Sequence, residues 1–230
     1  MKFDFNIKKN NLTIYSSKEL SNFANEFVNY YNENIERIKM ILSIYQNVNQ
    51  IVALTDDESK ANFVYGKSSF SGFYNDTGVF AYINLNGNKN KDYMFKGLMH
   101  EVIHHLYEYH VYGTDKERIT WVDEGIAQFL SGQKEELQDE MRYQAFIEEN
   151  LKDTDDINLN ELNHDDRSFG NKNGYNLSYI AIRYLYETTS PEEFSEIIRN
   201  HEKLINYGKK IIPSIKSHYI SDSIKSNNKK

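Results

Sequence analysis

The 230-residue chain contains no cysteine, which excludes a disulfide scaffold and any metal site built from thiolates. Only two prolines are present, and no stretch approaches the 18 consecutive apolar residues that a membrane span requires. The opening residues 1–6 also lack the apolar core of a secretion signal. These absences predict a cytoplasmic protein that does not contact a membrane. A composition rich in Asn, Lys, Ile and Tyr is typical of low-GC bacteria.

Charge narrows the possible partners. The formal net charge is −7 and the sequence pI is about 5.5. An acidic chain repels the phosphate backbone, so nucleic acid is not an expected partner. The length suits one globular unit, or two lobes flanking a cleft, that buries about 70% of its unfolded surface.

The segment His100-Glu101-Val102-Ile103-His104 is the most informative motif in the chain. Two imidazoles four residues apart on a helix share one face and can reach a single Zn²⁺, while the adjacent carboxylate can hold an activated water. Chance would produce this string in only about 2% of chains with this composition. Its context is helical from about residue 92 to 112, with Asp92 as a possible N-cap and Gly113 following the end.

Glu124 is the expected third ligand. Thr114 and Glu117 have the spacing of a capping box, which predicts a helix over residues 115–131 that ends at Gly132. Glu124 shares a face with apolar residues, and a carboxylate there is unfavourable unless a cation balances it. Gly125 would permit close approach to the first helix. Three protein ligands leave one coordination position open, as in catalytic zinc sites, although another divalent ion could occupy the site.

These motifs resemble the gluzincin metallopeptidases, the peptidase MA-like zincins that include the zinc aminopeptidases. The resemblance covers roughly residues 78 to 190 and includes the segment Trp121-Val122-Asp123-Glu124-Gly125-Ile126-Ala127. It implies a zinc-dependent peptidase acting on peptides or proteins, with His100, His104 and Glu124 as ligands. From the residues themselves, Glu101 is the general base that takes a proton from the water and delivers it to the leaving amine.

The resemblance also implies a role for a downstream tyrosine. Tyr175-Asn176-Leu177-Ser178, continuing to Tyr184-Leu185-Tyr186-Glu187, is similar to the family helix whose first tyrosine polarises the scissile carbonyl. Tyr175 is therefore the candidate oxyanion donor, with Tyr179 and the loop residue His164 as alternatives. The simpler interpretations are a packed aromatic for Tyr179 and a solvated loop histidine for His164.

Two departures from the family pattern are present. The stretch 78–86, which corresponds to the aminopeptidase segment that holds the substrate's amino terminus, has no acidic residue, and this favours an endopeptidase or oligopeptidase. Gln128 stands where thermolysin-like members place an aspartate that orients a ligating histidine.

A strand is expected at residues 78–86 because apolar and other residues alternate there. If this strand lies at a sheet edge, Phe80, Ala81 and Tyr82 could bind an extended substrate through backbone hydrogen bonds. An interior strand is the equal alternative.

Strands early and helices late predict an α+β, zincin-like fold: a small mixed sheet with an edge strand packed on the active-site helix, then a mainly helical half. We expect a single domain over 1–230, with an α/β lobe at about 1–113, a helical lobe at about 114–220 and a frayed tail at 221–230. Further expected elements are helices at 17–43, 174–187, 191–201 and 204–220, and strands at 50–55, 61–65 and 69–73. Two other functions stay open: a catalytically silent peptide- or metal-binding relative, and a helical interaction protein with a chance motif.

Overall fold

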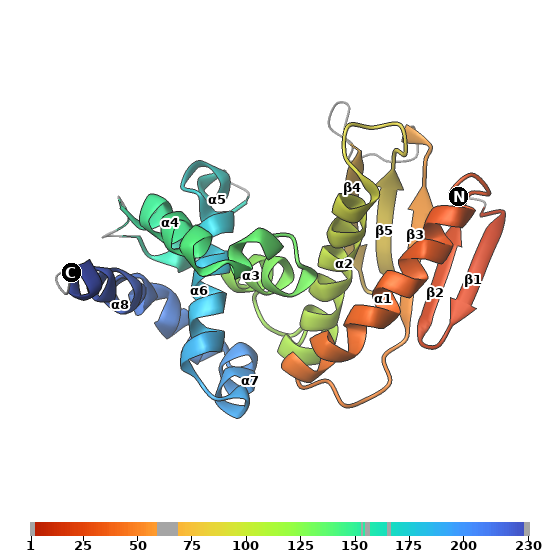
Figure 1. The fold of residues 1–230 in the computed structure, drawn as a ribbon. Coiled ribbons are helices and arrows are strands. Elements are labelled where there is room, and N and C mark those ends of the chain that lie inside the picture. The colour runs from red at the N-terminus through yellow and green to blue at the C-terminus, as the bar shows by residue number, and fades with distance from the viewer. Residues whose placement is uncertain (1–2, 59–68, 153, 155–156, 165–166, 228–230) are drawn as a thin grey trace. The chain divides into compact units, whose positions relative to one another are not determined.

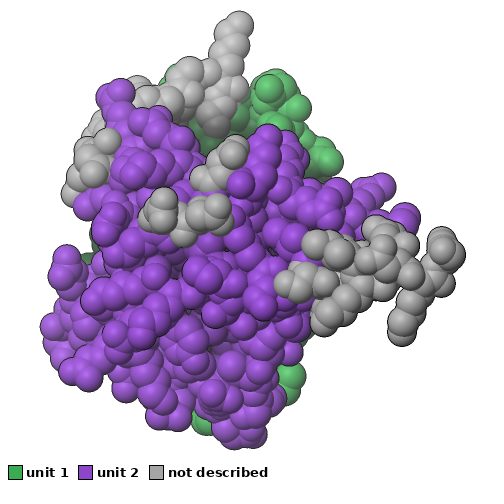
Figure 2. Space-filling model, turned by 90° about the vertical axis from the view of Figure 1, so that its left-hand side faces the viewer, with its two compact units in different colours: residues 1–111 green, residues 112–230 purple. Residues whose placement is uncertain are grey.

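The computed structural model describes residues 3–58, 69–152, 154, 157–164 and 167–227, with side chains placed as far as residue 220. The chain divides into two compact units, Met1–Val111 and Tyr112–Lys230, which Figure 2 colours separately. Each unit is described by itself below. The strand expected at 61–65 lies outside the described residues.

The first unit is built on a mixed five-stranded sheet of order β1-β2-β3-β5-β4. The pairs β1–β2 and β4–β5 are antiparallel, while β2–β3 and β3–β5 are parallel. The strands are β1 Phe5–Lys9, β2 Leu12–Ser16, β3 Gln50–Thr55, β4 Phe70–Asn75 and β5 Gly78–Ile83. The strand predicted at 50–55 is therefore confirmed residue for residue.

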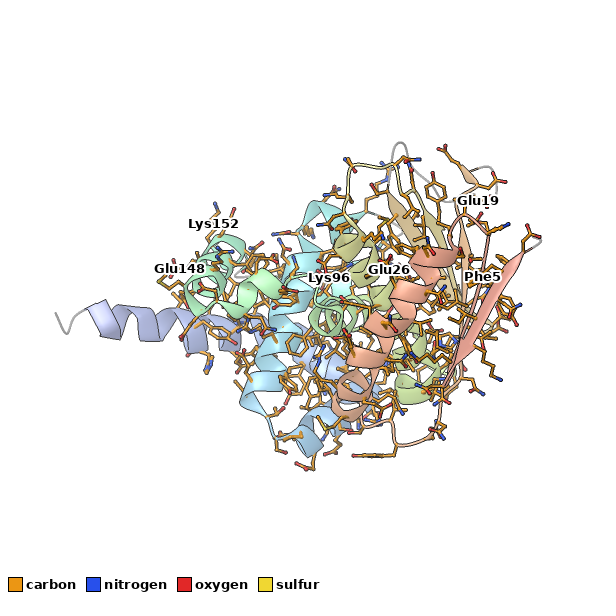
Figure 3. All side chains as sticks on the ribbon, turned by 45° about the vertical axis from the view of Figure 1, so that its right-hand side comes forward. Phe5, Glu19, Glu26, Lys96, Glu148 and Lys152 are labelled. Carbon is orange, nitrogen blue, oxygen red and sulfur yellow. The ribbon has the colours of Figure 1, made fainter. Side chains whose placement is uncertain are left out.

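Helices α1 Ser21–Ile41 and α2 Lys91–Tyr107 cover the same face of the sheet (Figure 1). Their aromatic contacts explain the packing, because the ring of Phe95 on α2 lies 4.9 Å from that of Phe23 and 5.8 Å from that of Phe27 on α1. Outside this core, Lys91 pairs with Glu26 at 2.7 Å; Figure 3 labels Glu26 on α1 and Lys96 on α2. The sheet and helix α1 thus hold helix α2, which carries the metal motif, in position.

Strand β5 alternates as the sequence predicted, but its place in the sheet corrects one expectation. It pairs with β3 on one side and β4 on the other, so it is an interior strand, and β4 lies at one edge of the described sheet. Phe80, Ala81 and Tyr82 pair with residues of both neighbouring strands, so β5 itself offers no free edge to a substrate. Val79 and Ala81 are buried beneath the helices, so alternation directs Phe80 and Tyr82 to the opposite face of the sheet. The predicted edge position of this strand is therefore wrong, and the substrate-binding role of Phe80, Ala81 and Tyr82, which assumed an edge, stays an untested prediction.

The β1–β2 hairpin was not anticipated from the sequence. Leu12 and Ile14 are completely buried, whereas β1 contributes only the half-buried Phe5 and Ile7, too short a pattern to predict a strand. The turn depends on Asn10, whose φ of 53° places it in the left-handed region that asparagine tolerates.

Helix α2 has a different N-cap from the one predicted, and it ends before Gly113 as predicted, although its last turn is π-helical. Asn90, rather than Asp92, is the N-cap, and its side chain accepts a hydrogen bond from the Tyr93 amide. At the other end the backbone continues as a π-helical turn, Glu108–Tyr112, before Gly113 leaves the helix with φ of 97°. Single π-helical turns within or beside α-helices occur frequently at functional sites.

The second unit is helical. Its helices are α3 Thr120–Ser131, α4 Glu140–Leu151, α5 Ser168–Asn171, α6 Gly174–Thr188, α7 Pro191–Arg199 and α8 His201–Asn227, with 3-10 turns at Glu135–Gln138 and Leu159–Glu161. The α+β character predicted from the sequence is confirmed. Helix α8 extends through residues 221–227, where a frayed tail was expected. Among the described residues, none of the helices is long and apolar enough to cross a membrane.

The start of α3 was mispredicted. The helix begins at Thr120 rather than near residue 115, so the capping box of Thr114 and Glu117 does not form. Instead the Tyr112 hydroxyl donates to the Glu117 carbonyl at 2.9 Å, and the Lys116 ammonium donates to the Tyr112 carbonyl at 2.8 Å. These bonds fold residues 112–117 back on themselves. The predicted end is correct, because Gly132 caps α3 with φ of 79°.

Candidate metal centre

The two histidines of the motif converge at their Nε2 atoms. His100 and His104 lie one turn apart on α2, their rings are nearly perpendicular at 89°, and the two Nε2 atoms are 2.9 Å apart. His104 is buried and His100 is half-buried. Two nitrogens this close, aimed at a common point, are suited to share one cation.

Glu101 is held against the edge strand of its own unit. Gly72 on β4 lies directly beneath it, because a Cβ at Gly72 would be only 2.7 Å from the Glu101 Cγ. One turn earlier, a Cβ at Gly97 would come within 2.9 Å of the Phe70 ring. Close contacts therefore fix the register between β4 and α2 at two successive turns, and Gly72 leaves the space that the Glu101 side chain uses.

The next histidine, His105, is buried, and its ring packs against those of Tyr109 and His110. Burial lowers the pKa of His105 to about 4, with a contribution from nearby His110 and an opposing one from Asp76. Burial also lowers the pKa of His110. His110 is therefore a weaker base than an exposed histidine.

In the second unit, Glu124 has two cationic or polar neighbours that sequence reasoning did not assign to it. The His164 Nε2 lies 3.1 Å from the Glu124 Oε1, and the Arg118 Nη2 lies 3.7 Å from the same oxygen. Arg118 also forms an ion pair with buried Asp123. The glutamate is itself buried, so these partners offset the cost of removing its charge from water.

Helix α3, which carries Glu124, is pressed against α6. A Cβ at Gly125 would lie 2.5 Å from the Ser178 carbonyl oxygen and 2.6 Å from the Ile182 Cγ1. Gly125 therefore serves the contact with α6, and the approach to the motif helix expected from the sequence stays a prediction. Gln128 joins the same two helices, because its Nε2 donates to the carbonyls of Glu124 at 3.3 Å and Tyr175 at 3.0 Å. Its side chain holds backbone groups and does not orient a histidine.

The candidate oxyanion donors differ in their surroundings. Tyr175 is 45% exposed at the start of α6, with its ring 5.8 Å from that of His164 and 4.8 Å from that of Phe169. Tyr179 is only 4% exposed and packs among the rings of Phe129, Tyr143 and Phe146. Tyr179 is therefore a core aromatic, whereas His164 contacts Glu124 and Tyr175 lies next to His164.

The three predicted ligands form a group that could hold a metal ion. One donor atom from each of His100, His104 and Glu124 lies within 4.8 Å of the others, the sole such group of three or more among the described residues. Two imidazole nitrogens and a carboxylate oxygen are the donor set of many catalytic zinc sites. The donor atoms of these residues therefore suit a divalent cation such as the Zn²⁺ predicted from the sequence.

Comparison with known proteins identifies the fold. No protein-family model matches the chain, and no curated protein matches its sequence. Among solved structures, native yeast LTA4 hydrolase matches 93% of this chain with a TM-score of 0.50 and 13% identity. The chain spans 38% of the length of that yeast protein. The chain thus shares a zincin-like fold with part of yeast LTA4 hydrolase, and it carries the His-His-Glu group.

The metal ligands of the site could be predicted from the sequence, whereas the residues that support Glu124 were not predicted. The contact between His164 and Glu124 joins residues 40 positions apart, and no local pattern predicts it. The role of Arg118 was easier to predict, because a cation five residues before the adjacent pair Asp123-Glu124 is a visible charge pattern.

Proposed function

We propose that this chain is a zinc-dependent metallopeptidase that hydrolyses peptide bonds. The observation that carries the proposal is the convergence of His100, His104 and Glu124 donor atoms within 4.8 Å on a gluzincin-like fold. Chance retention of this donor set, in this order and on this fold, would require three independent coincidences. The His-His-Glu donor set on this fold favours a metal-dependent hydrolase over a helical interaction protein.

The residues of the chain divide the chemistry between them. When bound, a zinc ion supplies a polarising positive charge and acidifies a water molecule. His100, His104 and Glu124 hold the ion, and His164 and Arg118 steady the glutamate. Glu101 accepts the proton of the attacking water and returns it to the leaving amine, which requires a carboxylate rather than an amide at this position.

The Tyr175 hydroxyl is proposed as the donor to the oxyanion that forms at the scissile carbonyl. Its exposure and its proximity to His164, which contacts Glu124, support this role. A single oxyanion donor typically contributes about 100- to 1000-fold in kcat. Replacement Tyr175→Phe should therefore lower kcat by about that factor with zinc retained, and an unchanged kcat would assign the role elsewhere.

The decisive experiment compares wild type with Glu101→Gln on a mixed peptide library, with products identified by mass spectrometry and zinc measured in the same samples. We expect wild type to cleave and Glu101→Gln to bind zinc without cleaving. Glu148→Gln, the same substitution at an exposed position on α4 (labelled in Figure 3), is the matched control and should cleave like wild type.

Three outcomes would contradict the proposal. Stoichiometric zinc with no cleavage by wild type would favour the silent, peptide- or metal-binding relative. Absence of zinc from wild type, or zinc retained in His104→Ala, would exclude the proposed metal site.

A further inference from the structure

Tyr74 is the residue of β4 that faces the second histidine of the motif. It pairs in register with Val79, which is buried under the helices, so the Tyr74 side chain lies on the α2 side of the sheet. Its ring stacks on the imidazole of His104, with centroids 5.2 Å apart and planes 15° from parallel. A near-parallel ring at this distance restricts rotation of the imidazole about its Cβ–Cγ bond.

The Tyr74 hydroxyl is anchored to the same helix. It donates to the Glu108 Oε2 at 2.7 Å, and Glu108 lies one turn after His104, at the first residue of the π-helical turn. A hydrogen bond to a carboxylate is shorter and stronger than one between neutral groups. His104, Tyr74 and Glu108 therefore close a loop in which the helix holds the tyrosine and the tyrosine holds the imidazole.

We propose that Tyr74, held by Glu108, is a positioning residue that fixes the ring plane of His104 so that its Nε2 is presented to the metal ion. This inference rests on the proposed function, because it concerns the same ion. Tyr74 acts through His104 and has no assigned contact with substrate. The perpendicular setting of the two imidazoles explains why such a device is useful, since each ring needs its own rotation to reach one ion.

The consequence is a metal affinity that depends on a strand outside the motif. Partners that orient metal-binding histidines typically contribute 10- to 100-fold in affinity. The test measures the zinc Kd of the full chain by competition with a chromophoric chelator. Tyr74→Leu, which removes ring and hydroxyl, should weaken zinc binding by at least about tenfold. Tyr74→Phe, which keeps the ring, should weaken it less.

Phe73→Leu is the matched control, because Phe73 neighbours Tyr74 on the same strand but stacks on Phe80 at the opposite face of the sheet. It should leave the zinc Kd within twofold of wild type. The absorption spectrum of the cobalt(II)-loaded protein gives a second readout, which should change in both Tyr74 variants and not in Phe73→Leu. If Tyr74→Leu fails to fold, the Kd and cobalt spectrum of Tyr74→Phe decide the question.

The result that overturns this inference is a folded Tyr74→Leu with a wild-type zinc Kd and cobalt spectrum. A higher KM at saturating zinc, with Kd unchanged, would likewise overturn it and assign Tyr74 to substrate binding. Both results leave the proposed peptidase intact, since wild type would still bind zinc and cleave. A wild type that binds no zinc would instead contradict the proposed function, and this inference with it.

Discussion

The tight contact between α3 and α6 makes Gly125→Ala a sharp test of the helix packing behind Glu124. The added methyl would meet the Ser178 carbonyl oxygen at 2.5 Å and the Ile182 Cγ1 at 2.6 Å. The side chain could move aside, but the carbonyl belongs to the α6 backbone, so the helices must separate. Overpacking of this kind costs up to about 3 kcal/mol.

Helix propensity acts in the opposite direction. Alanine is favoured over glycine inside a helix by about 1 kcal/mol, so the net loss of stability should be about 2 kcal/mol. For a chain of this size that corresponds to a fall in Tm of roughly 4–8 °C. The Tm and the urea midpoint, followed by circular dichroism at 222 nm, provide the measurement.

Gly170→Ala is the matched control, because a Cβ at Gly170 would meet no atom within 4 Å. That variant should keep the wild-type Tm or raise it slightly, since replacing glycine without strain limits the unfolded chain. A Gly125→Ala protein as stable as wild type, or more stable, would refute the close-approach argument and leave propensity as the dominant effect.

Three further results are expected. Gly72→Ala should lower kcat at least tenfold with zinc still bound, because its methyl would displace Glu101; unchanged kinetics would refute this. Excess chelator should lower the Tm of wild type, since a ligand at 100 times its Kd stabilises by about 2.7 kcal/mol, and should leave the Tm of His104→Ala unchanged. The pKa of Tyr112 is raised from 10 to about 12, mainly by burial and to a smaller extent by the negative charges of Glu117 and Asp115. The contribution of neutral Tyr112 to stability is complete below pH 10 and is lost as pH rises through 12. The free energy of unfolding of Tyr112→Phe should therefore fall less steeply with pH in that window than that of wild type.

Local pattern predicted those elements whose own residues determine them. The strand at 50–55 and the helix at 174–187 are bounded by turns and carry strong apolar periodicity, and both occur nearly as expected. The metal ligands were found because their chemistry fixes residue type and spacing. Where two local patterns competed, prediction failed: Thr114 and Glu117 have capping-box spacing, but hydrogen bonds to Tyr112 hold that segment in another conformation.

Strand order was beyond the reach of the sequence. Alternation shows which residues of 78–83 face the helices, but an interior strand and an edge strand alternate alike. The difference lies in pairing with β3, whose residues are more than 25 positions away. The same limit applies to Tyr74 and His164, since both reach their partners across long sequence separations.

The peripheral place of β4 has a consequence for how the protein loses function on heating. Within the described sheet this strand has one strand neighbour, β5, whereas β5 has two. Amides of β4 should therefore exchange with deuterium sooner than those of β5, through openings that cost less than global unfolding. Each such opening would release, at the same time, the contact of Gly72 with Glu101 and the stacking of the Tyr74 ring on His104. Thermal inactivation should accordingly begin at temperatures where far-UV dichroism still reports an intact fold.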